Sequence, residues 1–160
     1  MSDQDDLRAY LNNHVAGGTG AIEMVEHCQA ANEGEPLAEF LAELVVEIQK
    51  DHRTLGDLMS GLDATENRFK QVMARMGEKA SHLKLGGGDL GNLLTLETLS
   101  LGIEGKACMW KSLMQVHGAR GPFLAVDFEA LIKRADDQRR ALEPWRLAAA
   151  TAALNEKAAP

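Results

Sequence analysis

The stretch PLAEFLAELVVEIQKDHRTLGDLMSG, residues 36–61, decides the fold. Apolar side chains recur along it at alternating intervals of four and three residues, which places them on one side of an α-helix. Three other long stretches have the same rhythm, and no segment has the alternation or the β-branched content of a strand. The series here, which runs to the next leucine, is Leu37, Leu41, Leu44, Ile48, Asp51, Leu55, Leu58 and Leu62.

Breaks rich in glycine, proline and polar residues divide the chain into five predicted helices. Pro36 and Pro122 each open an apolar run, which suits the first turn of a helix. We therefore expect one all-α domain covering residues 1–160, a four-helix bundle of two long antiparallel hairpins with an additional shorter crossover helix. The helices are expected at about residues 5–31, 36–61, 66–85, 90–117 and 123–154.

The short helix predicted at 66–85 decides the topology, because it joins the two hairpins. If it runs along the outside of the bundle, the second and third long helices are parallel. If it is a stub at one end, the bundle is simply up-down-up-down. About 19 residues at 1.5 Å each would span most of the bundle, which favours the crossover.

Composition and charge exclude several classes of protein. The 160 residues carry 17 Lys and Arg against 24 Asp and Glu, a net charge of -7, so we expect no nucleic-acid surface. The acidic first six residues are unlike a signal peptide, and no run of 18 apolar residues predicts a membrane span. Cys28 and Cys108 lack CxxC spacing and lie in apolar helical surroundings. They predict two reduced core thiols and a cytoplasmic protein.

Polar residues interrupt the apolar series at one height of the predicted bundle. Residues at one height of an antiparallel hairpin have a constant index sum, so Asp51 is level with residue 17, near His14, and Gln138 is level with residue 102. With a crossover, Glu104 also comes to the height of Asp51. We expect His14 to donate to Asp51, because an unpaired buried carboxylate costs several kcal/mol. Three interpretations remain open: a structural network, a metal or small-ligand site, or side chains that face solvent.

Glycines interrupt two helices at the same height. Each costs about 1 kcal/mol of helix propensity relative to alanine, so their presence needs a compensating reason. Close approach of two helices is one such reason, and room for a ligand or a local distortion of the helix is another. The five glycines are Gly17, Gly18, Gly20, Gly102 and Gly105.

These features together resemble the ferritin-like superfamily, whose members hold two metal ions with glutamates and Glu-x-x-His motifs. The resemblance covers the two hairpins, the crossover and the mid-height polar residues. At the positions of the motif the chain has Glu47-Ile48-Gln49-Lys50 and Ala135-Asp136-Asp137-Gln138, and no Glu-x-x-His occurs. The resemblance therefore implies a bundle that has lost or rebuilt its di-metal centre.

The sequence favours a binding or structural role over a catalytic one, with no cofactor and no catalytic residues. The alternative is a divergent metal protein in which His14, Asp51 and Glu104, supported by Gln138, hold one divalent ion for redox or storage chemistry. A third interpretation is a protein-interaction module, in which the Ala-rich residues 147–154 pack on a second copy to form a homodimer. Neither a nucleic acid nor a membrane is expected as a partner.

Overall fold

The computed structural model describes residues 3–62 and 87–155, which form four α-helices and one short 3-10 helix. The described residues contain no strand, and the all-α prediction is confirmed. The predicted helix at 66–85 and the last five residues lie outside the described part. The elements are α1 (Asp3–Ala31), α2 (Pro36–Leu62), α4 (Gly88–His117), η2 (Gly121–Ala125) and α5 (Phe128–Leu154).

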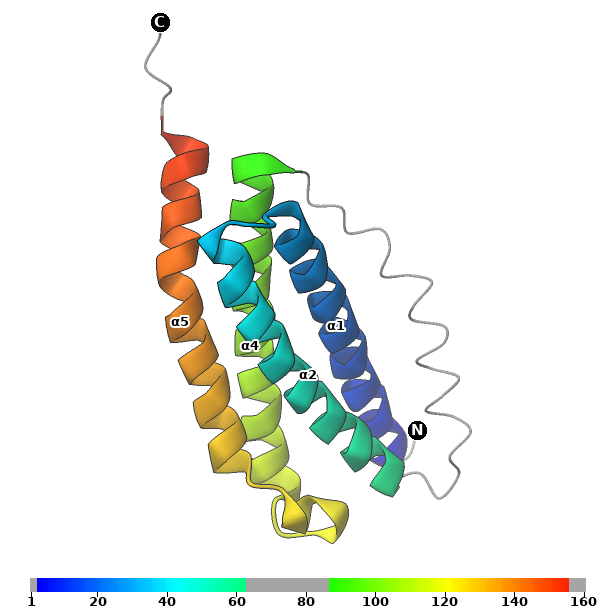
Figure 1. The fold of residues 1–160 in the computed structure, drawn as a ribbon. Helices are drawn as coiled ribbons and strands as arrows, with labels where there is room; N and C mark the ends of the chain where they lie inside the picture. The colour runs from blue at the N-terminus through cyan, green and yellow to red at the C-terminus, as the bar shows by residue number, and fades with distance from the viewer. Residues whose placement is uncertain (1–2, 63–86, 156–160) are drawn as a thin grey trace, which may run out of the picture.

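The two hairpins, α1–α2 and α4–α5, pack into a bundle in which α2 and α4 run in the same direction (Figure 1). At one end, Asn32 after α1 and Asn92 in α4 exchange side-chain hydrogen bonds of 2.8 and 2.9 Å. At the other end, Gly61 lies against Pro122. Leu62 and Gly88 therefore lie at opposite ends of the bundle, as a crossover connection requires.

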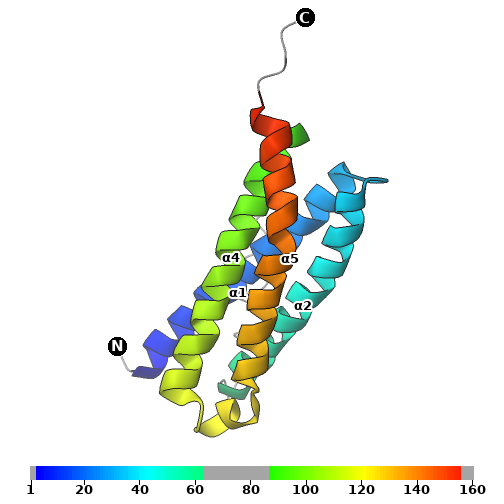
Figure 2. The ribbon, with the colours of Figure 1, turned by 90° about the vertical axis from the view of Figure 1, so that its left-hand side faces the viewer.

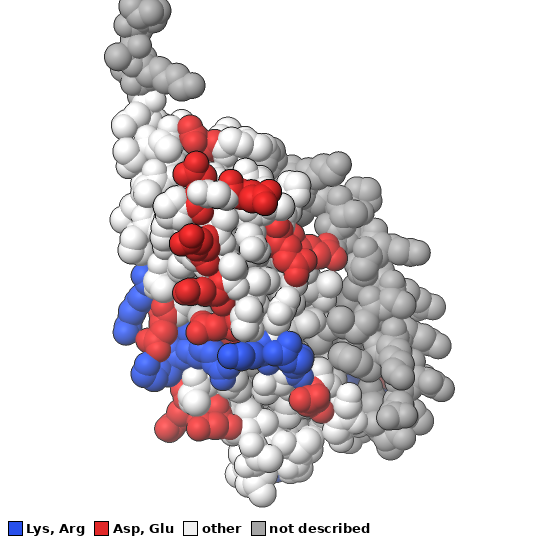
Figure 3. All heavy atoms as spheres, viewed as in Figure 1, with Lys and Arg blue, Asp and Glu red and all other residues white. Residues whose placement is uncertain are grey.

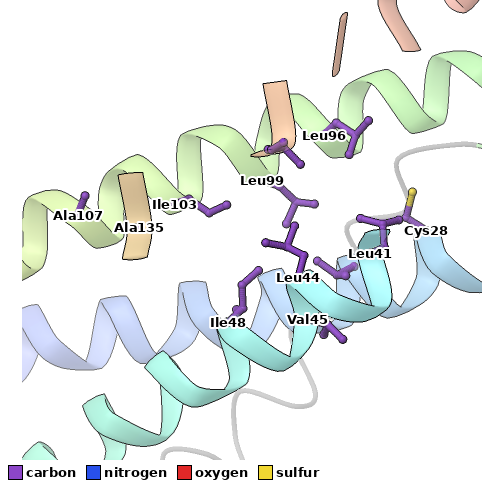
Figure 4. Close-up of a cluster of buried hydrophobic side chains, with 12 residues drawn as sticks. Cys28, Leu41, Leu44, Val45, Ile48, Leu96, Leu99, Ile103, Ala107 and Ala135 are labelled. Atoms are coloured by element: carbon purple, nitrogen blue, oxygen red, sulfur yellow. The ribbon is translucent and has the colours of Figure 1, made fainter. Parts of the chain in front are cut away.

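The core consists of two clusters of buried apolar side chains, one toward each end of the bundle. The view turned by 90° shows α4 and α5 running alongside each other, with α1 passing obliquely behind them (Figure 2). In the first cluster, leucines of α2 and α4 face one another and Cys28 of α1 closes one end (Figure 4). In the second, Trp110 and Phe128 pack with their ring centroids 6.2 Å apart. The buried polar side chain Asp51 lies between these clusters along α2, whereas Gln138, also buried, lies between Ala135 and Leu142 of the first cluster on α5.

The last helix begins later than the sequence predicts, at Phe128 instead of residue 123. Gly121 has φ of 52°, a left-handed conformation that favours glycine. It starts the short η2, which contains Pro122. The carboxylate of Asp127 then caps α5 by accepting a hydrogen bond from the Ala130 amide at 3.0 Å. Leu124, which falls within the helix predicted at 123–154, is consequently outside α5 and 71% exposed.

Pro144 lies inside α5, which continues past it to Leu154, and Trp145 stacks on Phe40 with a centroid distance of 5.3 Å. The expectation of two core thiols needs correction. Cys28 is buried as expected, whereas Cys108 is exposed on α4. Both thiols are free.

Candidate ligand-binding site

The centre of the bundle contains a buried carboxylate with two cationic partners. Asp51 of α2 is 1% exposed. Its Oδ2 atom accepts a hydrogen bond of 2.5 Å from Lys106 Nζ of α4. Its Oδ1 atom lies 3.3 Å from a terminal guanidinium nitrogen of Arg134 on α5, an ion pair without hydrogen-bond geometry. Three helices thus converge on one carboxylate, and the two cations offset the cost of burying it.

Gln138 of α5 joins this group through both ends of its amide. Its Oε1 atom accepts a hydrogen bond of 2.6 Å from Lys106 Nζ. Its Nε2 atom donates to Asp51 Oδ2 over 3.4 Å and to Glu47 Oε2 over 3.2 Å. Asp51 and Gln138 were expected at one height from the index sums, and the structure brings them together. We call Asp51, Lys106, Arg134 and Gln138 the polar layer.

Burial acts on the charged form of the lysine in this layer. It lowers the pKa of the Lys106 ammonium, while the nearby Asp51 carboxylate acts in the opposite direction and limits the decrease. The side chain of Lys106 is only 15% exposed. The charge of Lys106 is therefore retained mainly through its pairing with Asp51.

The other two residues expected in the layer lie outside its hydrogen-bond network. The ring of His14 makes an edge contact with Tyr10 at a centroid distance of 4.8 Å and does not donate to Asp51. Burial lowers the pKa of His14. Glu104 lies on the outer side of α4, where it pairs with Arg139 and accepts a weak hydrogen bond from the Cys108 thiol at 3.7 Å.

These pairings bear on the one-metal interpretation. The carboxylates of Asp51 and Glu104 are each paired with a cationic side chain, Lys106 for Asp51 and Arg139 for Glu104. Within residues 3–62 and 87–155, no three His, Cys, Asp or Glu side chains gather closely enough to hold a metal ion.

The same part of the chain contains no helix that is both long and apolar enough to cross a bilayer.

A cavity of about 220 Å³ opens beside the polar layer, between α1 and α4, and α2 forms part of its wall. Four of the five glycines expected at this height line it, namely Gly17, Gly18, Gly102 and Gly105, whereas Gly20 does not. Its polar boundary includes His14, Asp51, His52 and Lys106. The remainder of the wall is mainly apolar and contains Ala21, Ile48, Leu55, Leu99, Ile103, Met109 and Trp110.

The glycines differ in what an added methyl group would meet. A Cβ atom at Gly18 would lie 2.7 Å from His52 Nδ1, so this glycine permits close approach of α1 and α2. At Gly17, Gly102 and Gly105 a Cβ atom would meet nothing within 4 Å. Close approach therefore explains only Gly18, and open space adjoins the other three. Their lack of side chains helps to leave the cavity unfilled.

His52 and Trp110 add buried polar atoms to the cavity wall. Burial lowers the pKa of His52, whose Nε2 atom lies 3.3 Å from the hydroxyl of Thr19. Its Nδ1 atom, packed against Gly18, has no hydrogen-bond partner among the described residues, and neither does Trp110 Nε1. With neutral histidines and an apolar wall, this side of the bundle suits a ligand that is largely apolar.

The opposite side of the polar layer opens on a groove of about 320 Å³ between α2 and α5. Charged residues line it, among them Glu47, Lys133, Arg134 and Asp137. The view of Figure 3 shows a column of acidic side chains with a band of basic ones across it. Lys133 and Asp137 form an ion pair of 2.5 Å, so part of the charge in this groove is already neutralised internally.

The interpretation of the sequence missed Lys106 and Arg134. The buried series of α4 contains Leu96, Leu99, Ile103, Trp110 and Leu113, in which Lys106 occupies the next position of the four-three rhythm. Ser100 and Met114 also have four-three spacing from these residues, but Ser100 is only half-buried and Met114 is 41% exposed. Taking the alternate positions of the rhythm one residue earlier, at Leu99, Lys106 and Leu113, identifies Lys106 as the polar member of the series.

Comparison with known proteins gives no relative from which a role could be transferred. No protein-family model, curated protein sequence or solved structure matches the chain. The class of protein defined by the fold and the site is therefore an all-α bundle with a buried polar layer beside a glycine-lined cavity.

Proposed function

We propose that this protein is a ferritin-like bundle without a di-metal centre, and that it binds one small, mainly apolar organic molecule in the cavity between α1 and α4. Two features support the ferritin-like part: the parallel direction of α2 and α4, and the polar residues at mid-height. The observation that carries the binding role is the glycine-lined cavity beside a buried ion pair.

The cavity volume indicates the size of the ligand. At about 220 Å³ it exceeds the roughly 150 Å³ of an engineered apolar cavity that binds benzene. It is smaller than the roughly 300–1,000 Å³ typical of sites for drug-sized ligands. The ligand is therefore about the size of one substituted ring.

Fluorobenzene, observed by fluorine NMR, tests this function because its signal broadens and shifts on entering a protein cavity. We expect saturable binding to the wild-type chain and loss of binding in Gly17→Leu, which places a side chain at the cavity wall. Gly20→Leu is the matched control, since it lies on the same helix in open space but does not line the cavity. Equal binding to all three proteins would contradict the proposal.

Metal analysis of protein purified without chelator tests the alternative. If the wild-type protein contains a stoichiometric metal ion and both His14→Ala and Asp51→Ala lose it, the site is a metal site and the small-molecule proposal is wrong.

A further inference from the structure

Lys106 differs from the other lysines of the described residues. Lys50, Lys111 and Lys133 are exposed, whereas Lys106 has most of its side chain inside the bundle. It also lines the cavity, between Gly105 and the core residue Ala107. A buried amine next to an apolar cavity is the setting in which lysine serves as a nucleophile toward carbonyl groups.

The hydrogen bonds of Lys106 use only part of its capacity to donate. An ammonium group has three N–H donors. Asp51 Oδ2 and Gln138 Oε1 accept two of them, at 2.5 and 2.6 Å, and no third acceptor lies within reach among the described residues. Since Lys106 lines the cavity, a ligand with a carbonyl oxygen could accept the third.

We propose that Lys106 condenses with a small apolar aldehyde held in the cavity, to form a protonated imine paired with Asp51. This inference rests on the proposed function, because the aldehyde must first enter the cavity. It goes further by naming the chemical class of the ligand and the atom that captures it. A ligand carboxylate suits the site less well, since its charge would lie close to the buried Asp51 carboxylate.

The condensation balances with the groups that are present. Asp51 accepts one proton from the Lys106 ammonium, and the neutral amine attacks the carbonyl carbon, so that a C–N bond forms as the C=O π bond breaks. Asp51 donates its proton to the resulting alkoxide oxygen and accepts one from the attacking nitrogen, which gives a neutral carbinolamine. Asp51 then returns a proton to its hydroxyl group, which leaves as water while the C=N bond forms. Ammonium and aldehyde thus become protonated imine and water, with no change in oxidation state.

Asp51 is compatible with this outcome because reactant and product carry the same positive charge. The ammonium and the protonated imine are both cations at the same nitrogen, so the carboxylate stabilises reactant and product alike. Asp51 is the proton carrier and Gln138 a positioning residue, whose carbonyl oxygen directs the amine before attack.

Reductive trapping tests the proposal. The full-length protein is incubated with benzaldehyde and cyanoborohydride at neutral pH, and the benzylated lysines are located by peptide mass spectrometry. We expect Lys106 to be labelled faster than the internal references Lys111 and Lys133, on the order of tenfold or more, because the cavity holds the aldehyde beside one amine. Excess fluorobenzene should slow the labelling of Lys106 alone.

Two variants locate the reaction. Gly17→Leu should suppress labelling of Lys106 and leave that of Lys111 unchanged, whereas Gly20→Leu should change neither. Label spread over the exposed lysines with no excess at Lys106 would overturn the proposal, as would labelling of Lys106 that Gly17→Leu leaves unaffected. If fluorobenzene binds but Lys106 gains no excess label, only the imine fails and the binding function stands. If fluorobenzene does not bind, the binding function itself fails.

Discussion

The two sides of the bundle differ at the height of the polar layer. Between α1 and α4, glycines remove side chains from the wall and a mainly apolar cavity remains. Between α2 and α5, charged side chains line a groove and form ion pairs and hydrogen bonds around Asp51. Lys106 belongs to both sides, since it lines the cavity and its amine reaches the carboxylate. Stability at this height should therefore depend on the ion pairs, while the glycine side should tolerate added atoms except at Gly18, which lies against His52.

The largest effect should come from removing the central carboxylate. Asp51→Ala leaves the Lys106 ammonium without its counter-charge in a buried position, so we expect a loss of about 3–5 kcal/mol in the free energy of unfolding, measured in urea. The control is Asp57→Ala, which removes an exposed carboxylate from the same helix. A loss below about 1 kcal/mol, the usual range for a surface pair, would show that the ion pair is effectively solvated.

Replacing both Asp51 and Lys106 should lower the free energy of unfolding less than removing Asp51 alone. Asp51→Leu combined with Lys106→Met substitutes apolar groups for two buried charges and leaves neither uncompensated. We expect the double variant to be more stable than Asp51→Ala by about 2 kcal/mol or more in the same urea measurement. If the double variant is instead the less stable of the two, the hydrogen bonds to Gln138 matter more than the charge balance.

The glycine side should respond in opposite directions at neighbouring positions. Gly17→Ala adds a methyl group in open space and should raise the unfolding free energy by about 0.5–1 kcal/mol, because alanine favours the helix. Gly18→Ala should instead lower it by about 1–2 kcal/mol, because its methyl group would press on His52 Nδ1. Thermal or urea unfolding of the two variants measures the difference. Equal changes in the unfolding free energy of the two variants would mean that α1 and α2 can move apart at Gly18 without a loss of stability.

Helix period and index arithmetic predicted much of this arrangement. The four-three rhythm of α2 identified its buried face and the buried Asp51, and the hairpin sums placed Gln138 near it. Both methods work because the rise and twist of a helix are nearly constant. The predicted crossover direction also agrees with the described helices, although the crossover helix itself lies outside them.

Sequence reasoning failed where the choice between adjacent helix positions was decided by tertiary packing. On α1, Val15 is fully buried and His14 only partly, so the histidine lies beside the core instead of in it. On α4, the buried position next to Ser100 is Leu99, and the polar member of the series is Lys106 instead of Ser100. A long basic side chain on a helix is usually solvated. Only the position of Asp51 on another helix explains why this lysine faces inward.

The smallest effect concerns the two histidines at the cavity. Burial lowers the pKa of both His14 and His52, so the folded protein binds fewer protons than the unfolded chain over part of the acidic range. Their contribution to stability is complete above the ordinary histidine pKa of about 6.5 and is lost as the pH falls through the lower folded values. Urea midpoints should therefore decrease over this interval, and less so in His52→Gln. His27→Gln, at an exposed position, should leave the slope of wild type unchanged. If the two variants give the same slope, protonation of His52 does not oppose folding, and the α1–α4 side of the bundle admits water more freely than its apolar wall indicates.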